Sequence, residues 1–206
     1  MSTEAPTAGR TPLMRPDWGY ATGRDMEEIT REDWEMLARQ KTAFLAERQA
    51  NHVLSMFRVA EEQPSFGYEI SMYRHGLQAA TLMHRAGFDE ETVVVGLLHD
   101  IAYDASPDTH GAAAAAMFGP YCSDRNLWML RWHQDFGAYH SVHCPGVDRG
   151  ARERFRGHPH FEFTARFVAE FDQTTIRADL PTLPLEAFVP MVHRFFATPP
   201  RAVELP

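Results

Sequence analysis

Residues 93–102, VVVGLLHDIA, decide the fold of this chain. Residues 93–98 are apolar on every side of a helix, and Asp89 stands before them at a position that favours a helix N-cap. A helix without a polar face belongs in the centre of a hydrophobic core. The run ends on the adjacent polar pair His99 and Asp100. The stretch that predicts a central helix therefore also places an imidazole and a carboxylate inside the protein.

Helical patterns continue on both sides of this run, and no segment shows the alternation of a β-strand. Thr30 and Asp33 have the spacing of a capping box at the start of a long amphipathic helix over residues 30–62, in which residues 49–51 are a candidate break. The chain is expected to be all-α, with one long irregular loop over residues 140–158. Further helices are expected over residues 69–86, 107–118, 124–138, 159–173 and 184–197.

The domain organisation follows from length and local composition. Residues 1–25 are rich in Pro, Gly, Ala and Thr and are expected to form a flexible arm. Residues 26–206 are expected to form a single helical bundle with its core over residues 66–197. A chain of this size typically buries about 70% of its unfolded surface without a structural metal. Any metal ligands should therefore serve chemistry.

Charge and cysteine usage narrow the choice of partners and compartment. The chain of 206 residues has 28 acidic against 20 basic side chains, a net charge of -8, which argues against binding to nucleic acid. The two cysteines, Cys122 and Cys144, have no paired spacing and fit a reducing compartment. No apolar run is long enough to span a bilayer, and no targeting segment is recognised. We expect a cytoplasmic monomer or homodimer that acts on a small molecule, away from membranes.

The pair His99 and Asp100 is the first candidate site. Burying two such groups costs several kcal/mol unless hydrogen bonds or a cation satisfy them. A structural hydrogen bond between them would be a sufficient explanation if the pair stood alone. Imidazole together with carboxylate also suits zinc, iron or manganese.

The pair does not stand alone, because His75, Asp172, His110 and His133 add to it a pattern of the form H…HD…D with two further imidazoles. This pattern resembles the HD-domain superfamily over roughly residues 66–197. Within the superfamily, the chain is similar to the mixed-valent di-iron oxygenases, which include myo-inositol oxygenase and the HD-domain organophosphonate oxygenases. The segments that carry the resemblance are RHGLQAA, LLHDIAY, THGAAAA, WHQDF, ARERFRGHPHF, FDQ and PLEAFVPMV.

The resemblance implies a dinuclear centre of Fe(II) and Fe(III) bridged by Asp100, with manganese or zinc as alternatives. It places His75, His99, Asp100 and Asp172 on one metal and Asp100, His110 and His133 on the other. Six side chains with one bridging carboxylate offer about seven donor atoms, whereas two six-coordinate metals need about twelve. About five positions would stay open for substrate and dioxygen.

Several further residues are candidates for contact with substrate. Gln78 lies three residues after His75, on nearly the same helix face, and the resemblance implies that it reaches the substrate. Tyr103 stands where many HD proteins have His or Lys, which favours hydrogen-bond donation over a general base. Tyr68 and Glu69 lie in the region of a lid in similar oxygenases, although a turn and helix start explains them equally well.

The loop region supplies the remaining candidates. A cluster of arginines could clamp a phosphonate, phosphate or carboxylate, and Arg156 is the favoured member, although a surface ion pair is the default for such residues. His158 is a candidate substrate contact. The other members of the two groups are Arg149, Arg152 and Arg154, and His140, His143 and His160.

Three functions compete for this site. The first is an oxygenase that uses O2 for oxidative C–P or C–C cleavage of a small hydroxylated, anionic substrate. The second is an HD phosphohydrolase that acts on a phosphomonoester or nucleotide, with metals that polarise a phosphoryl oxygen. The third is a metal-holding or nucleotide-sensing module without turnover. Tyr103 and the scarcity of lysine favour the oxygenase, and the arginines favour the hydrolase.

Overall fold

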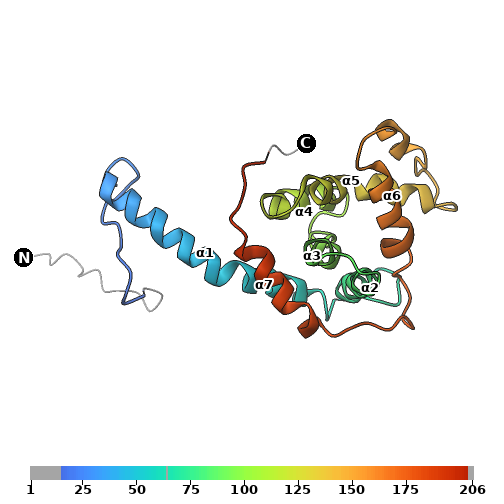
Figure 1. Cartoon of the computed structure of the whole chain (residues 1–206), viewed down its shortest axis with the longest axis horizontal. Coiled ribbons are helices and arrows are strands. Elements are labelled where there is room, and N and C mark those ends of the chain that lie inside the picture. The colour runs from blue at the N-terminus through green and yellow to red at the C-terminus, as the bar shows by residue number, and fades with distance from the viewer. Residues whose placement is uncertain (1–14, 64, 204–206) are drawn as a thin grey trace, which may run out of the picture. The chain divides into compact units, whose positions relative to one another are not determined.

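The computed structural model describes residues 15–63 and 65–203. In this part of the chain all regular structure is helical, so the predicted all-α class is confirmed (Figure 1). The first 14 residues of the expected flexible arm lie outside the described residues. Three 3-10 helices, η1 (Gly119–Tyr121), η2 (Ala151–Phe155) and η4 (Leu185–Ala187), and a π-helix, η3 (Val168–Asp172), accompany the α-helices. The α-helices are α1 (Arg31–Val59), α2 (Met72–Arg85), α3 (Glu90–Leu98), α4 (His110–Phe118), α5 (Asp124–His140), α6 (Phe161–Phe167) and α7 (Val189–Ala197).

The chain divides into two compact units, the first ending at Arg48 and the second beginning at Gln49. Helix α1 runs through this boundary as one element, so the candidate break near residues 49–51 was wrong. In the first unit the side chain of Gln40 exchanges two hydrogen bonds of 2.8 and 3.0 Å with the backbone of Gly19. These bonds fix the segment before α1 alongside the helix.

The core of the second unit is built around α3, as its apolar sequence predicts. All seven residues from Thr92 to Leu98 are buried. The helix contacts α2, α5 and α7, and Figure 1 shows it among these helices. Asp89 caps it, since its carboxylate accepts a 2.8 Å hydrogen bond from the backbone N–H of Thr92. The central helix and its N-cap are therefore both confirmed.

Two glycines let helices approach closely next to histidines. A Cβ atom at Gly76 on α2 would collide with the carbonyl oxygen of Leu97 on α3. A Cβ atom at Gly111 on α4 would lie 2.7 Å from the carbonyl oxygen of Leu130 on α5. Each glycine follows a histidine directly in the sequence. Close packing of α2 on α3 and of α4 on α5 thus brings two pairs of histidines together.

The helix boundaries differ from the expected ones mainly at loops and at the end of α6. Helix α2 begins only after Ser71, whose hydroxyl accepts from the backbone N–H of Arg74. The helix expected over residues 159–173 ends instead in the π-helix η3, and the loop over residues 140–158 contains η2. Among the described residues, no helix has the length and apolar character needed to cross a membrane.

Candidate metal centre

Four buried histidines from four different elements form the walls of one site. His75 lies on α2, His99 at the end of α3, His110 at the start of α4 and His133 on α5, and each is at most 5% exposed. Their Nδ1 atoms lie 2.7–2.9 Å from the backbone carbonyl oxygens of Thr175, Gly96, Pro107 and Leu130, respectively.

These carbonyl contacts fix the tautomer of all four rings. A carbonyl oxygen only accepts hydrogen bonds, so each Nδ1 must carry the proton and donate it. In a neutral imidazole the lone pair is then on Nε2, which points to the centre of the site. Metal-ligating histidines characteristically donate their other ring N–H to a carbonyl or carboxylate in this way.

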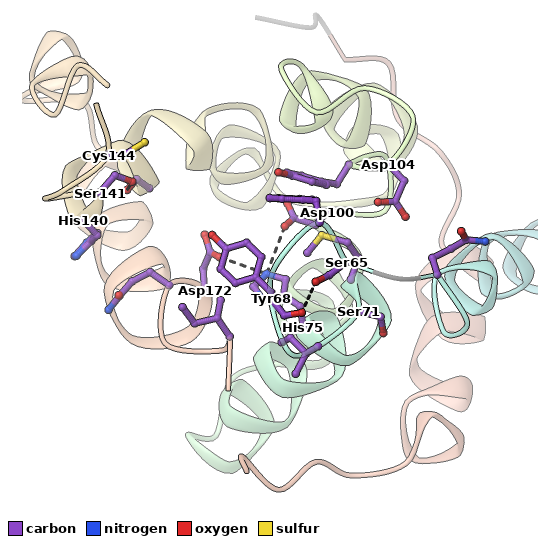
Figure 2. Close-up of a pocket in the computed structure, with 18 of the residues that line it drawn as sticks. Ser65, Tyr68, Ser71, His75, Asp100, Asp104, His140, Ser141, Cys144 and Asp172 are labelled. Atoms are coloured by element: carbon purple, nitrogen blue, oxygen red, sulfur yellow. Dashed lines mark hydrogen bonds and ion pairs between the residues drawn. The ribbon is translucent and has the colours of Figure 1, made fainter. Parts of the chain in front are cut away.

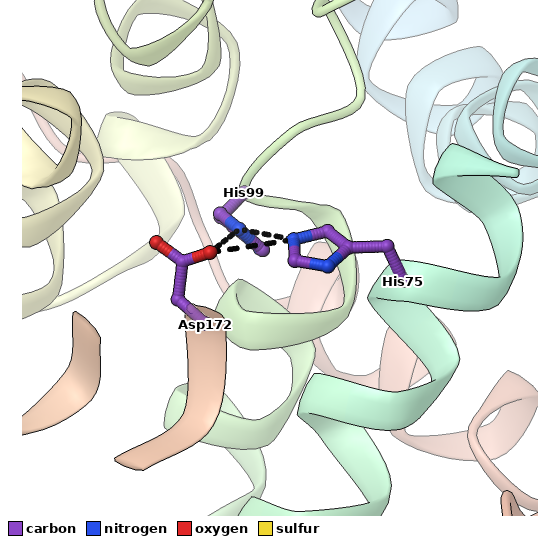
Figure 3. A group of neighbouring side chains, drawn as sticks. All are labelled: His75, His99 and Asp172. Atoms are coloured by element: carbon purple, nitrogen blue, oxygen red, sulfur yellow. Dashed lines mark hydrogen bonds and ion pairs between the residues drawn. The ribbon is translucent and has the colours of Figure 1, made fainter. Parts of the chain in front are cut away.

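The first cluster of donor atoms consists of His75, His99 and Asp172 (Figure 3). The two Nε2 atoms are 3.2 Å apart, and Oδ1 of Asp172 lies 3.4 Å from His75 and 3.7 Å from His99. Oδ2 of Asp100 lies 3.4 and 3.6 Å from the same two nitrogens. Four side chains therefore offer four donor atoms around one point.

The second cluster is tighter and has three donor atoms. His110 and His133 hold their Nε2 atoms 2.9 Å apart. Oδ1 of Asp100 lies 3.0 Å from His110 and 3.1 Å from His133. The two carboxylate oxygens of Asp100 thus face different histidine pairs, as expected of a bridging ligand. The structure brings all six sequence-predicted ligands together.

The donor set fits a pair of metal cations. With each Nδ1 donating to a carbonyl, every atom that faces either point is an imidazole Nε2 or a carboxylate oxygen, and either protons or metal cations can offset the repulsion between them. An octahedral metal with bonds of about 2.1 Å separates neighbouring ligand atoms by about 3.0 Å. The 2.9–3.1 Å edges of the second cluster match one face of such an octahedron, which is the arrangement of a triad of two histidines and one carboxylate.

In the metal-free site, the electrostatics favour a protonated imidazole at His75 beside an ionised carboxylate at Asp100. Burial lowers the pKa of His75, but hydrogen bonds to Asp100 and Asp172 outweigh burial and hold that pKa well above its usual range. Burial raises the pKa of Asp100, and the neighbouring imidazoles, His99 first among them, bring it well below its usual range. Protons and metal cations therefore compete for the same Nε2 lone pairs.

The π-helix η3 positions Asp172 and a residue that sequence reasoning missed. In η3 the backbone N–H of Gln173 donates to the carbonyl oxygen of Val168, five residues earlier, at 3.0 Å. π-turns add one residue to a helical turn and are frequent at functional sites. After this turn, fully buried Thr175 holds both its carbonyl and its hydroxyl oxygen within 3.1 Å of Nδ1 of His75. The one signal in the sequence that could have pointed to Thr175 is its position three residues after the predicted ligand Asp172.

A cavity of about 700 Å³ opens onto the first cluster through His75, Asp100 and Asp172 (Figure 2). Tyr68 and Tyr103 line it, as expected of substrate-facing residues. Its other lining residues come from the segment before α2, the loop between α3 and α4, the end of α5 and the following loop, and the segment after η3. They include Ser65, Phe66, Ser71, Asp104, His140, Ser141, His143, Cys144 and Gln173.

Gln78 and Glu69 do not line this cavity. Gln78 is fully buried, and its amide donates to the carbonyl oxygen of Arg177, while its Oε1 atom has no hydrogen-bond partner among the described residues. Residues three apart on a helix differ in direction by about 60°. That difference turns Gln78 from the direction of His75 toward the segment after η3. Glu69 is exposed outside the lining.

The expected anion clamp is also absent from the cavity. Arg156 pairs with Glu153 at 2.6 Å, and its guanidinium lies 4.3 Å from the ring centroid of Phe161. His158 stacks on Trp128 at 4.3 Å and does not line the cavity. Among the described residues, no arginine or lysine lines it. Arg156 is therefore better described as a surface ion pair, because Glu153 lies close to it in the sequence and binds its guanidinium.

Comparison with known proteins gives no family: no protein-family model matches the chain, and no curated protein matches it. In the part of the chain that the structure describes, fold and site define an all-helical protein with candidate metal-binding groups of histidine and aspartate.

Proposed function

We propose that this protein is a dinuclear iron oxygenase that uses O2 to cleave a C–C or C–P bond in a small hydroxylated molecule. The observation that carries the proposal is Asp100, whose two oxygens face separate histidine pairs at 3.0–3.6 Å. A pair of bound irons would supply the one-electron redox chemistry that activates dioxygen. Thiolate-free ligation by imidazole and carboxylate suits iron, and the few protein donors leave room for reactants.

The residues of the cavity would bind and orient the substrate. Burial, and then the charge of Asp100, raise the pKa of Tyr103, so its phenol stays protonated and can donate a hydrogen bond. Ser141 and Gln173 place further neutral polar groups on the cavity wall. These groups suit the recognition of hydroxyl oxygens.

The charge of the cavity supports the oxygenase over the phosphohydrolase. A phosphomonoester carries up to two negative charges, which proteins commonly offset with arginine or lysine. The described cavity wall has neither, and Asp104 adds a carboxylate to it. For the same reason, a phosphonate would find no basic side chain on the described wall to offset its charge. A neutral alcohol therefore fits the wall better than the anionic substrate expected from the sequence.

The test is anaerobic reconstitution with Fe(II), followed by metal analysis, electron paramagnetic resonance after partial oxidation, and oxygen uptake with a panel of polyols and 1-hydroxyphosphonates. We expect about two irons per chain, a mixed-valent signal and substrate-dependent uptake. His133→Ala should lose the signal and the uptake. His193→Ala, an exposed histidine on α7, is the matched control and should retain both. Anaerobic phosphate release from phosphomonoesters without oxygen uptake would make the protein a hydrolase instead.

A further inference from the structure

Exposed apolar side chains gather at the cavity that opens onto the first metal cluster. Among the described residues of the second unit, eight large hydrophobic side chains are exposed, and four of these line this cavity. We name the four the apolar wall: Phe66, Tyr68, Val142 and Ile176, which are 75%, 51%, 57% and 45% exposed, respectively. Single exposed hydrophobic residues are normal, but a group of them at a concave site is typical of a place where a ligand binds. The apolar wall therefore favours a ligand with an apolar group.

Aromatic rings make up one part of the apolar wall. The ring of Phe66 stacks on that of Tyr103 with centroids 6.1 Å apart, and it meets the ring of Tyr68 edge-on at 5.6 Å. The ring of Tyr103 lies 5.1 Å from that of His110, a predicted ligand of the second cluster. A row of rings thus runs from the metal centre to the exposed Phe66.

Two other segments add aliphatic side chains to the apolar wall. Val142 follows α5, and Ile176 follows η3. Figure 2 shows Ser141 on the opposite side of Asp172 from Ser65, which directly precedes the aromatic part of the wall. An apolar group bound in the cavity would therefore contact side chains from more than one direction.

The cavity is larger than a small polyol needs. Its volume of about 700 Å³ corresponds to about twenty water molecules at about 30 Å³ each. A six-carbon polyol has about twelve carbon and oxygen atoms and would fill about half of this space. Pockets of about 300–1,000 Å³ are typical of larger ligands, and a few polar groups among apolar side chains fix the orientation of such ligands. A hydroxylated head group at the metals would thus leave room for an apolar chain.

We infer that the substrate is a neutral amphiphile, an alcohol or diol with an alkyl chain of about six to ten carbon atoms. Its hydroxyl oxygens bind at the first metal cluster, beside the neutral polar groups of Ser141 and Gln173, and its chain lies on the apolar wall. An anionic head group is disfavoured, because the described lining has no arginine or lysine and includes Asp104. The inference rests on the proposed function for the role of the hydroxyl group at the metals. The contact between the chain and the apolar wall does not require iron.

Isothermal titration calorimetry of the Fe(II)-reconstituted protein under anaerobic conditions tests the inference, because without O2 the substrate binds but is not consumed. The probes are 1,2-alkanediols of about four to ten carbon atoms. We expect one diol per chain. Each added methylene should tighten binding by about three- to fourfold, the gain that burial of one methylene group provides.

Variants of the apolar wall locate the chain. The double variant Val142→Ser, Ile176→Ser should weaken binding of decane-1,2-diol by about tenfold or more, and that of butane-1,2-diol by less than about twofold. Loss of folding would affect both diols, so this difference reports the wall alone. The matched control is Val147→Ser, because Val147 is 36% exposed on the same loop as Val142 and lies outside the lining. It should bind both diols like wild type.

The outcomes separate this inference from the proposed function. Affinities that do not rise with chain length, or equal losses for the two diols in the double variant, would overturn the amphiphile. Binding that rises with chain length, without oxygen uptake in air, would support the amphiphile and reject the oxygenase. Oxygen uptake with short polyols, at an affinity independent of chain length, would overturn the amphiphile and support the oxygenase.

Discussion

Asp100 is the residue whose replacement separates a dinuclear site from two independent ones. Its carboxylate supplies one oxygen to the first cluster and one to the second. Asp100→Ala leaves the first cluster with His75, His99 and Asp172, and the second with the imidazoles of His110 and His133 only. We therefore expect a loss at both sites, with the greater loss at the second.

The magnitude follows from the donor count. Outer hydrogen-bond partners of metal ligands typically change affinity by about 10–100-fold, and a direct ligand should exceed this range. The second cluster would lose one of three protein donors and its only negative charge, so we expect binding there to fall below detection. The first would lose one of four donors, and we expect it to weaken by more than about 100-fold.

The assay is metal content per chain after reconstitution and desalting, together with thermal unfolding of the metal-free form. His133→Ala should retain the first metal and lose the second. Asp104→Ala removes a carboxylate that lines the cavity without facing either cluster, so this control should bind like wild type. The fold should survive all three changes, because the core does not depend on metal. If Asp100→Ala and His133→Ala each retained one metal with wild-type affinity, the bridge would be refuted.

Three further predictions concern packing, pH and thiol reactivity. Gly76→Ala forces a methyl group into a carbonyl of α3 and should destabilise the protein by about 1–3 kcal/mol in urea unfolding; an unchanged midpoint would contradict the close approach of α2 and α3. For the metal-free protein, the raised pKa of His75 adds stability that is fully present below about pH 6.5 and is lost as pH rises through the folded-state pKa. The lowered pKa of Asp100 adds stability that is fully present above about pH 3.9 and is lost as pH falls through the folded-state pKa. Urea midpoints measured in chelator should therefore peak between these values, and a maximum above pH 8 would be inconsistent with the ion pairs. Exposed Cys144 should react with a disulfide reagent at neutral pH, while burial raises the pKa of Cys122 to about 12 and should leave it unreactive until the protein unfolds; equal rates would contradict this.

The sequence predicted the parts of the site that depend on local pattern. The apolar run before His99 can be stable only inside a core, so its burial follows from composition alone. The ring orientation of His99, His110 and His133 is also local, because each ring donates to the carbonyl three residues earlier. The helical class and the ring orientation of three candidate ligands could therefore be predicted without the fold.

Directions around the cavity could not be predicted in this way. A difference of about 60° on a helix turned Gln78 away from the cavity, and a π-turn set the direction of Asp172 and Thr175. Arginines near the loop form ion pairs with neighbouring carboxylates, as Arg156 does with Glu153. Their position in the sequence close to the predicted site did not show that they point away from the cavity.

What the sequence by itself determined is which elements are helical, which helix is central and which six side chains could bind metal. Only the tertiary structure decided that Asp100 has one oxygen for each histidine pair, and that the described wall of the cavity has no basic side chain. The physical reason is that the two kinds of feature depend on interactions between residues at different separations along the chain. Helix formation, capping and burial depend on neighbours in the sequence, whereas donor distances of about 3 Å depend on how closely separate helices pack. Here the helices can pack this closely because Gly76 on α2 and Gly111 on α4 have no side chain. A Cβ atom at Gly76 would collide with α3, and one at Gly111 would crowd α5.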